Sequence, residues 1–223
     1  MSRYFVVVAG NVGVGKSSLT RLLSRHLGWE AFYEAVDDNP YLADFYRDMR
    51  TWSFHSQIFF LSRRLLHHNE LSKRPNSVVQ DRSVYEDAEI FARNLYDQGL
   101  MSDRDYDSYR ELYHVICALL PPPTLVVYLQ ASVSTLQRRI TLRGRDYERD
   151  IDPAYLDRLN GLYDAWIQQF ALCPVLTVPT DNVDFVHCPE HERWVVQRIL
   201  AALPAIGQQS SLPLEWGAQQ KPT

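Results

Sequence analysis

The sequence predicts an α/β fold in which a five-stranded parallel sheet is flanked by helices. Short apolar runs rich in β-branched residues, the composition of buried parallel strands, alternate along the chain with longer segments of helical periodicity. Five such runs occur, and strands that alternate with helices are typical of a doubly wound parallel sheet. The chain has 223 residues, which suits one domain with a substantial core.

Residues that interrupt regular structure set the boundaries of the predicted elements. Gly28 ends the first helix, and proline-containing turns near Pro75 and Pro121 end later ones. Asp152 followed by Pro153 is a helix start, because proline is favoured in the first turn. The predicted strands are 4–9, 29–36, 77–80, 124–129 and 174–178. The predicted helices are 18–27, 41–49, 51–71, 84–96, 103–120, 133–142, 154–170 and 189–203.

The end of the chain differs in composition from the rest. Residues after Pro204 are rich in glycine, glutamine, serine and proline and lack a helical or strand pattern. We expect residues 1–203 to form the domain and residues 204–223 to be a mobile tail.

The first predicted strand leads into a complete GxxxxGKS motif, and a helix follows it, as a P-loop requires. Glycines let successive backbone N–H groups turn toward an anion, and the helix N-terminus adds partial positive charge. The alternative is a glycine-rich turn without a ligand. We expect ATP phosphates to bind at Gly10, Asn11, Val12, Gly13, Val14, Gly15, Lys16, Ser17 and Ser18.

Composition excludes several other classes of function. The net charge of −4 is spread without a basic block, which argues against binding to a nucleic acid polymer or to an anionic membrane. Three cysteines without a CxxC pair suggest reduced thiols, and no apolar run has membrane-spanning length. With no room for a signal peptide before the first strand, we expect a cytoplasmic protein. The cluster at 187–191 offers histidine, cysteine and glutamate, and we expect a structural or surface role for it rather than metal binding.

Two carboxylates lie at the C-terminal ends of predicted strands, at the sheet edge where ligands bind in such folds. Glu34 is placed to accept the proton of an attacking hydroxyl group, although it could equally be a surface residue before a turn. Asp81 can serve Mg²⁺ together with the Ser17 hydroxyl group, and Arg82 can contact phosphate. The alternative for Asp81 and Arg82 is a helix cap with an ion pair.

An arginine-rich segment follows the strand at 124–129. Arg139, Arg143 and Arg145 lie on a helix end and a loop, as expected for a lid that neutralises charge during phosphoryl transfer. Their alternative is a solvated salt-bridge loop. A GTPase would be expected to carry DxxG and NKxD segments, and neither is present.

Polar and aromatic residues on two predicted helices suit a nucleobase. Gln57 and Arg64 are seven residues apart and share one helix face, while Asp87 and Phe91 share a side of the next helix. Amide, guanidinium and carboxylate groups can read the polar edge of a heterocycle, and Phe91 and Trp52 offer flat faces for stacking. Each aromatic residue taken alone is more often part of a core.

Several separated motifs together resemble the deoxynucleoside kinase family, which includes deoxycytidine, deoxyguanosine and deoxyadenosine kinases. The resemblance extends from the P-loop to about Val186. It rests on FYEAV at 32–36, WSFHSQ at 52–57, DRSVY at 81–85 and LRGR at 142–145. Ala35 replaces the usual proline of the first motif, and Asp81 stands where several members have glutamate.

The resemblance implies a P-loop kinase fold with a lid, and it implies roles for individual residues. Glu34 is implied to be the base on the 5′-hydroxyl group, and Gln57 to form paired hydrogen bonds with the nucleobase. Tyr46 and Glu148 fall at the positions that hold the sugar 3′-hydroxyl group. Asp184 and Phe185 resemble the loop that borders the ATP base. The usual homodimer of the family, packed through helices, is also implied.

These features lead us to expect transfer of the ATP γ-phosphoryl group, with Mg²⁺, to the 5′-hydroxyl group of a deoxynucleoside in nucleotide salvage. The Arg64 and Asp87 pair resembles members that accept purine deoxynucleosides or deoxycytidine, and the DDNPYL segment at 37–42 resembles the deoxyadenosine and deoxyguanosine kinases. Three alternatives stay open: a deoxycytidine-preferring or broad-specificity kinase, a nucleoside monophosphate kinase similar to thymidylate kinase, and a catalytically silent nucleotide-binding sensor.

Overall fold

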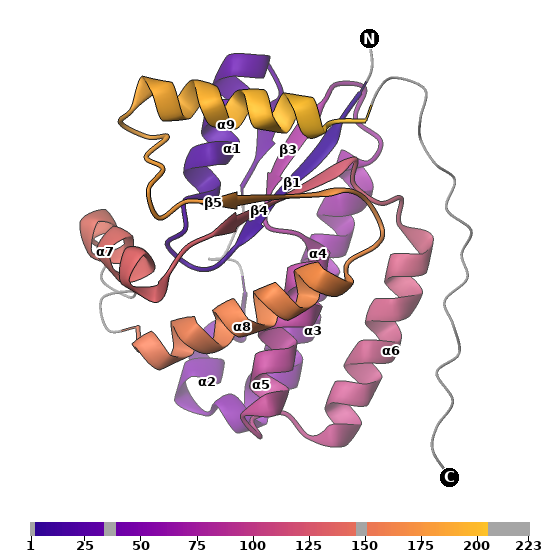
Figure 1. Cartoon of the computed structure of the whole chain (residues 1–223). Helices are drawn as coiled ribbons and strands as arrows, with labels where there is room; N and C mark the ends of the chain where they lie inside the picture. The colour runs from indigo at the N-terminus through magenta and orange to yellow at the C-terminus, as the bar shows by residue number, and fades with distance from the viewer. Residues whose placement is uncertain (1–2, 34–38, 146–150, 205–223) are drawn as a thin grey trace.

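A parallel sheet lies between two layers of helices in the computed structural model, which describes residues 3–33, 39–145 and 151–204 (Figure 1). Within these residues the sheet has five strands in the order β2-β3-β1-β4-β5, and every neighbouring pair is parallel. The strands are β1 (Phe5–Gly10), β2 (Glu30–Phe32), β3 (Val78–Asp81), β4 (Leu125–Gln130) and β5 (Val175–Pro179). The predicted α/β class and the parallel sheet are confirmed.

The helices agree with the predicted segments except in one region. Residues 84–96, expected to form a single α-helix, are divided into α4, a π-helix (η1) and α5. The helical elements of the described residues are α1 (Lys16–Leu27), α2 (Leu42–Arg47), α3 (Met49–Leu71), α4 (Val84–Glu86), η1 (Asp87–Ala92), α5 (Arg93–Asp97), α6 (Asp103–Leu119), α7 (Val133–Arg143), α8 (Pro153–Gln169) and α9 (Pro189–Ala202).

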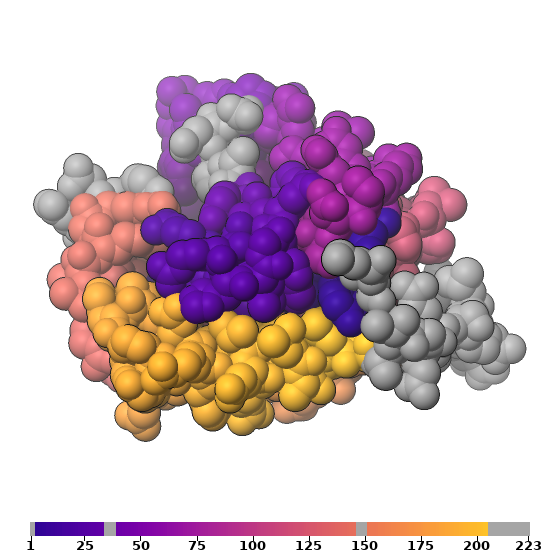
Figure 2. Space-filling model, turned by 90° about the horizontal axis from the view of Figure 1, so that it is seen from above, coloured from indigo at the N-terminus to yellow at the C-terminus, as the bar shows by residue number. Residues whose placement is uncertain are grey.

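Strand β1 is buried on both faces and separates two hydrophobic clusters. Val6 and Val8 pack with residues of α1 and α9, whereas Phe5, Val7 and Ala9 pack with residues of α3, α6 and α8. Side chains of a strand alternate between its faces, so a continuous apolar run supplies both clusters. Figure 2 shows α9 lying beside α1 on the surface, and residues of both helices belong to the cluster that contains Val6 and Val8.

The strand order brings the ends of three strands together beside the P-loop. Strand β1 lies between β3 and β4, and Val8 is in register with Asp81. On the outer side of β3, Phe32 is in register with Gln80. Ligands of open α/β sheets bind at the carboxyl ends of the strands, where the connections diverge. The C-terminal edge of β1, β2 and β3 is therefore the place to look for a site.

No helix within the described residues combines the length and apolar character needed to cross a bilayer.

Candidate active site

The loop between β1 and α1 has the conformation of a phosphate-binding cradle. Gly13 and Gly15 adopt positive φ angles of 81° and 109°. A Cβ atom at Gly15 would lie 3.1 Å from the ring of Phe185, so a larger residue is strained there by both its backbone and its neighbour. The largely buried Lys16 ammonium group donates to the carbonyl oxygens of Gly10, at 2.7 Å, and Asn11, at 3.0 Å. Lys16 thus lies folded over the loop at the N-terminus of α1.

Asn11 connects this loop to α8. Its side-chain amide donates to the carbonyl oxygen of Leu156 at 2.9 Å and to Asn160 at 2.8 Å. Its side-chain oxygen accepts from the backbone N–H of Val12 at 2.7 Å. Asn160 in turn donates to the carbonyl oxygen of Ala131, after β4. The P-loop is therefore fixed on its α8 side by buried hydrogen bonds.

Ser17 and Asp81 meet at the mouth of the cradle. The Ser17 hydroxyl group donates to Oδ2 of Asp81 at 2.5 Å. The other oxygen, Oδ1, is buried and accepts no hydrogen bond from the described protein groups. A buried carboxylate oxygen without a donor is costly unless a cation or water satisfies it. A hydroxyl and a carboxylate beside a phosphate cradle are ligands that Mg²⁺ prefers, so these residues fit the expected ion.

Arg82 has an unusual backbone conformation. It is the one non-glycine residue with a positive φ angle, 67°, among the residues that the structure describes. Such strain costs about 1–3 kcal/mol and persists where the surroundings enforce it, often at functional sites. The conformation puts the Arg82 guanidinium group over the ring of Phe91, with 4.3 Å between the guanidinium carbon and the ring centroid. The Arg82 cation therefore lies against one face of the Phe91 ring.

The predicted base-reading residues Arg64 and Asp87 are brought together. Nε and Nη2 of Arg64 donate to the two oxygens of Asp87 at 3.0 Å and 3.4 Å. Both side chains are buried, with exposed fractions of 6% and 5%. Gln57 is also buried on α3, the helix that carries Arg64. Trp52, in contrast, stacks on Tyr41, with 5.8 Å between the ring centroids. The polar groups therefore share a buried region, while Trp52 packs with a neighbouring tyrosine.

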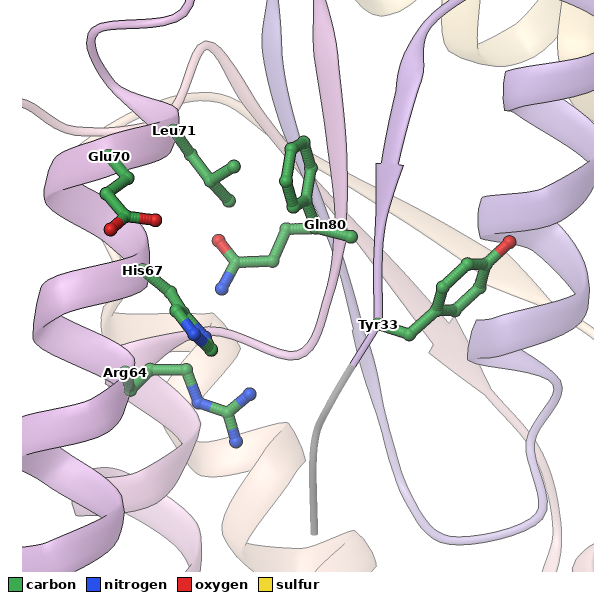
Figure 3. A pocket seen from close by; sticks show the side chains of 7 residues that line it. Tyr33, Arg64, His67, Glu70, Leu71 and Gln80 are labelled. Carbon is green, nitrogen blue, oxygen red and sulfur yellow. The ribbon is translucent and has the colours of Figure 1, made fainter. Parts of the chain in front are cut away.

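A small pocket of about 140 Å³ lies beside Arg64, between α3 and the ends of β2 and β3. Figure 3 shows the Gln80 amide pointing toward α3, and Tyr33 directed away from that helix. The Gln80 side-chain oxygen is buried and receives no hydrogen bond from described groups. The lining residues are Phe32, Tyr33, Arg64, His67, Glu70, Leu71 and Gln80.

The three arginines expected in a lid have different surroundings. Arg139 is half buried, and its guanidinium group donates to the carbonyl oxygens of Val14, at 3.0 Å, and Thr180, at 2.6 Å. Burial lowers its pKa. Arg143 and Arg145, at the end of α7 and after it, are exposed. Arg139 thus bridges the P-loop and the loop after β5, while the other two side chains face solvent.

The loop after β5 lies against the P-loop. Phe185 is buried and packs on Gly15, as the space around that glycine requires. Asp184 accepts from the backbone N–H groups of Val186 and His187, each at 3.0 Å. His191 accepts from the N–H of Asp184. The histidines of the 187–191 cluster are thus used to shape this loop. Within the described residues, no group of three or more His, Cys, Asp or Glu side chains could hold a metal ion.

The residues expected around the sugar are only partly described. Glu34 and Glu148 lie outside the described residues. Tyr46, on α2, is 67% exposed. Burial raises the pKa of Tyr155, on α8, and the Arg82 cation acts in the opposite direction.

Glu86 is a buried site-adjacent residue that the sequence reading overlooked. Its side chain is fully buried beside the P-loop. Burial raises its pKa, whereas the nearby cations Arg82 and Lys16 act in the opposite direction. The only sequence signal is its position three residues after Ser83, which matches a helix capping box. That signal predicts a helix start and gives no hint of contact with the P-loop.

A family comparison accounts for this combination of elements. The sequence model described as deoxynucleoside kinase matches residues 6–203. The chain belongs to the deoxynucleoside kinase family. Its activity is that of an ATP-dependent kinase acting on a deoxynucleoside, as the resemblance of its motifs predicted.

Individual relatives agree over most of the chain. The deoxyadenosine/deoxycytidine kinase of Bacillus subtilis (strain 168) is 38% identical over 200 residues, covering 89% of this chain and 92% of that protein. The deoxyguanosine kinase of Lactobacillus johnsonii is 37% identical over 212 residues, covering 91% and 94%. The structure of deoxyadenosine kinase from M. mycoides with bound dATP has a TM-score of 0.76 and 29% identity, and the match covers 88% of this chain and 99% of that one.

Proposed function

We propose that the protein transfers the γ-phosphoryl group of ATP to the 5′-hydroxyl group of a purine deoxynucleoside, deoxyadenosine or deoxyguanosine, in nucleotide salvage. The observation that carries this proposal is the buried Arg64–Asp87 pair, joined to the phosphate side of the site through Arg82 and Phe91. Phe91 is four residues after Asp87 and receives the Arg82 cation, so the base-reading pair and a phosphate-neutralising cation belong to one constellation.

The donor side is assigned to the P-loop and its neighbours. Lys16 would leave the loop carbonyls for the terminal phosphates, and backbone N–H groups of the loop would hold the rest. Ser17 and Asp81 would hold Mg²⁺, which neutralises charge between the β- and γ-phosphates. Arg139 positions the loop and the base-bordering segment by its backbone contacts. The full donor set is Gly10, Asn11, Val12, Gly13, Val14, Gly15, Lys16, Ser17, Ser18, Arg139, Arg143, Asp184 and Phe185.

On the acceptor side, Glu34 takes the proton of the 5′-hydroxyl group as the new bond forms. In sequence it comes two residues after Phe32, the last residue of β2, and β2 runs parallel to β3, which ends at Asp81; this order supports the assignment. Arg82, Arg143 and Arg145 neutralise the charge on the transferring group. Tyr46 and Glu148 hold the 3′-hydroxyl group. Gln57, Arg64, Asp87 and Phe91 bind the base, with Arg64 and Asp87 presenting a donor and an acceptor to a purine edge.

A deoxycytidine-accepting or broader specificity is the second candidate. It is favoured by one observation, namely that the Bacillus subtilis relative is a deoxyadenosine/deoxycytidine kinase. Purine preference is supported by relatives that are deoxyguanosine or deoxyadenosine kinases. Membership of the family argues against a monophosphate acceptor, and a carboxylate at position 34 would also repel a monophosphate.

A transfer assay tests the proposal. Mg·ATP labelled in the γ-phosphate is offered with deoxyadenosine, deoxyguanosine, deoxycytidine, thymidine or thymidine monophosphate, and the labelled products are separated. We expect label on a purine deoxynucleoside. Glu34→Gln should lower turnover by about 10²-fold or more while ATP binding stays nearly unchanged. Undiminished turnover in that variant would remove Glu34 as the base, and absence of any labelled nucleoside would refute the function.

We also propose that the protein is a cytoplasmic homodimer whose kinase domain is residues 1–203. Free thiols at Cys117, Cys173 and Cys188 support a reducing compartment. The dimer is supported by exposed apolar side chains on α6, at Leu112, Val115 and Leu119. Residues 84–96 are largely buried within the chain, so α6 is the better surface. Residues 205–223, assigned to the tail, lie outside the described residues.

A further inference from the structure

The carboxyl group of Glu86 is held by hydrogen bonds from four donors, and none of the roles proposed above uses it. Oε1 accepts from the backbone N–H of Gly10 at 3.3 Å and from the Tyr163 hydroxyl group at 2.8 Å. Oε2 accepts from the backbone N–H of Ser83 at 2.8 Å and from its hydroxyl group at 3.2 Å. The side chain has no exposed surface. One buried acid therefore connects the P-loop, the start of α4 and α8.

Helix capping explains only half of these contacts. Ser83 and Glu86 form a capping box at the start of α4, in which Glu86 bonds back to the Ser83 N–H. Glutamine is as suitable as glutamate for this role. The bonds from Gly10 and Tyr163 reach elements outside the helix, and capping does not require them.

The hydrogen bond from Gly10 to Glu86 fixes the start of the P-loop, whose carbonyl oxygens bind the Lys16 ammonium group. The N–H of Gly10 donates to Glu86, and the Gly10 carbonyl oxygen accepts from the Lys16 ammonium group at 2.7 Å. A Cβ atom at Gly10 would lie 2.5 Å from the Leu129 carbonyl oxygen, so the backbone is also pressed against β4. A shift of Gly10 would therefore move the resting place of Lys16.

A carboxyl group is the suitable partner because each of its oxygens faces a backbone N–H group. Backbone N–H groups can only donate, so both side-chain oxygens must accept. Glutamine offers one acceptor oxygen. Its NH₂ group would have to face the N–H of either Gly10 or Ser83, and one of these buried donors would be left without a bond.

We propose that Glu86 is a positioning residue for the ATP side of the site. It holds the Gly10 end of the P-loop, and with it the Lys16 ammonium group, and it ties this loop to α8 through Tyr163. Through the N–H groups of Gly10 and Ser83, the acid is linked to the residue that holds Lys16 and to the residue next to Arg82, two cations of the proposed phosphoryl transfer. The inference rests on the function proposed above, because it takes Lys16 and Arg82 to act on phosphate.

Glu86→Gln separates positioning from capping, because glutamine can keep the bond from Ser83 while losing the one from Gly10. We expect a cooperative thermal transition with a midpoint moderately below that of the wild type, because one buried N–H group loses its hydrogen bond. The dissociation constant for Mg·ATP, measured by calorimetry, should rise about tenfold, as for the loss of one hydrogen bond to a charged group. The KM for ATP should rise similarly, and the KM for the deoxynucleoside should stay within about twofold.

The matched control is Glu89→Gln, the same substitution three residues later. Glu89 is partly exposed and pairs with Arg110, away from the P-loop, so this variant should keep wild-type affinities. Unchanged ATP affinity in Glu86→Gln overturns the inference. An equal rise of both KM values overturns it too, since a merely structural residue would not favour one substrate.

Two further arrangements keep the test decisive. If Glu86→Gln does not fold, Tyr163→Phe removes one donor and leaves the acid in place. Its ATP affinity should fall about two- to threefold, less than in Glu86→Gln because the bond from Gly10 remains, and no change would overturn the inference. Calorimetry measures ATP binding without turnover. A wild type that binds ATP but phosphorylates no deoxynucleoside would refute the proposed function. The ATP affinities of Glu86→Gln and the wild type would still decide this inference.

Discussion

Arg64 and Asp87 show how one buried pair can serve both stability and recognition. Burying two charges is unfavourable unless they satisfy each other, and the paired bonds between these side chains do so. Removing one partner leaves a buried charge without its counter-charge. Replacing both by apolar residues avoids that penalty but removes the groups that we propose read the base.

Stability and activity should respond differently when both members of this pair are replaced. Asp87→Ala should lower the free energy of unfolding by about 3–5 kcal/mol, because the Arg64 guanidinium group stays buried. The double variant Arg64→Met with Asp87→Leu should recover most of that loss, yet its purine deoxynucleoside turnover should stay low. Urea unfolding and the transfer assay measure the two quantities. A double variant with wild-type turnover would show that the pair has no part in recognition.

His68 provides a prediction of pH dependence. Burial lowers the pKa of this histidine, although its bond to the Pro121 carbonyl oxygen acts in the opposite direction. The unfolded chain therefore binds a proton on His68 at a pH where the folded chain does not. The stability linked to this residue is complete above the ordinary histidine pKa of 6.5 and falls as the pH drops below that value.

Comparison of unfolding at two pH values checks this prediction. Between about pH 7.5 and pH 5.5, the urea midpoint should fall less in His68→Gln than in the wild type, because the variant cannot take up the proton. The control is His67→Gln, which changes the exposed neighbouring histidine. An equal fall in wild type and His68→Gln would contradict the assignment.

At the scale of elements, the π-helix η1 is the feature that local sequence patterns did not predict. It begins at Asp87 and includes Phe91, so two of the four proposed base contacts lie on it. π-helical segments are rare in proteins, but those that occur are often found at functional sites. The apolar pattern of 84–96 predicts a helix correctly but cannot distinguish hydrogen bonds to the fourth residue from bonds to the fifth. The packing of α3 and α8 against η1 decides that choice.

Helix α6 presents an apolar face to solvent. Leu112, Val115 and Leu119 are spaced by three and four residues and so lie on one side, with exposed fractions of 42%, 59% and 79%. Contiguous exposed apolar side chains are typical of an interface. This arrangement is the basis for placing the proposed dimer contact on α6.

Charged substitutions on this face test the dimer. Val115→Lys with Leu119→Lys should convert the protein to single chains, because two lysines cannot be desolvated in an apolar contact. Light scattering during size-exclusion chromatography gives the mass. Leu200→Lys, on α9 at the opposite face of the sheet, is the control and should leave the mass unchanged. A wild type with the mass of one chain would end the proposal.

At the scale of the whole molecule, the fold was predictable because its signals are local. The strand and helix periodicity, together with the P-loop motif, place each element, and the parallel connection rules then allow few arrangements. The motifs also pointed to candidate site residues near the ends of strands, such as Lys16 and Ser17 at the start of α1 and Asp81 at the end of β3. Their meeting at one edge follows from the topology.

Local sequence patterns did not predict the contacts between segments that are distant in the sequence. The charge and sequence position of Arg139 predicted a residue of a lid. In the structure, its guanidinium group instead donates hydrogen bonds to backbone carbonyl oxygens of the P-loop and of the loop after β5. Glu86 carries only a capping signal, although it also contacts Gly10 and Tyr163. Such roles depend on which backbone groups lie nearby in space, which neither spacing nor composition encodes.

The anchoring of α7 and α8 bears on the segment that joins them. Arg139 ties α7 to the P-loop, and Asn160 and Tyr163 tie α8 to the same loop, directly or through a single side chain. The segment that joins the two helices therefore starts and ends at points fixed independently of its own sequence. We therefore expect substitutions within that segment to disturb the phosphate cradle less than substitutions at Arg139, Asn160 or Tyr163 would.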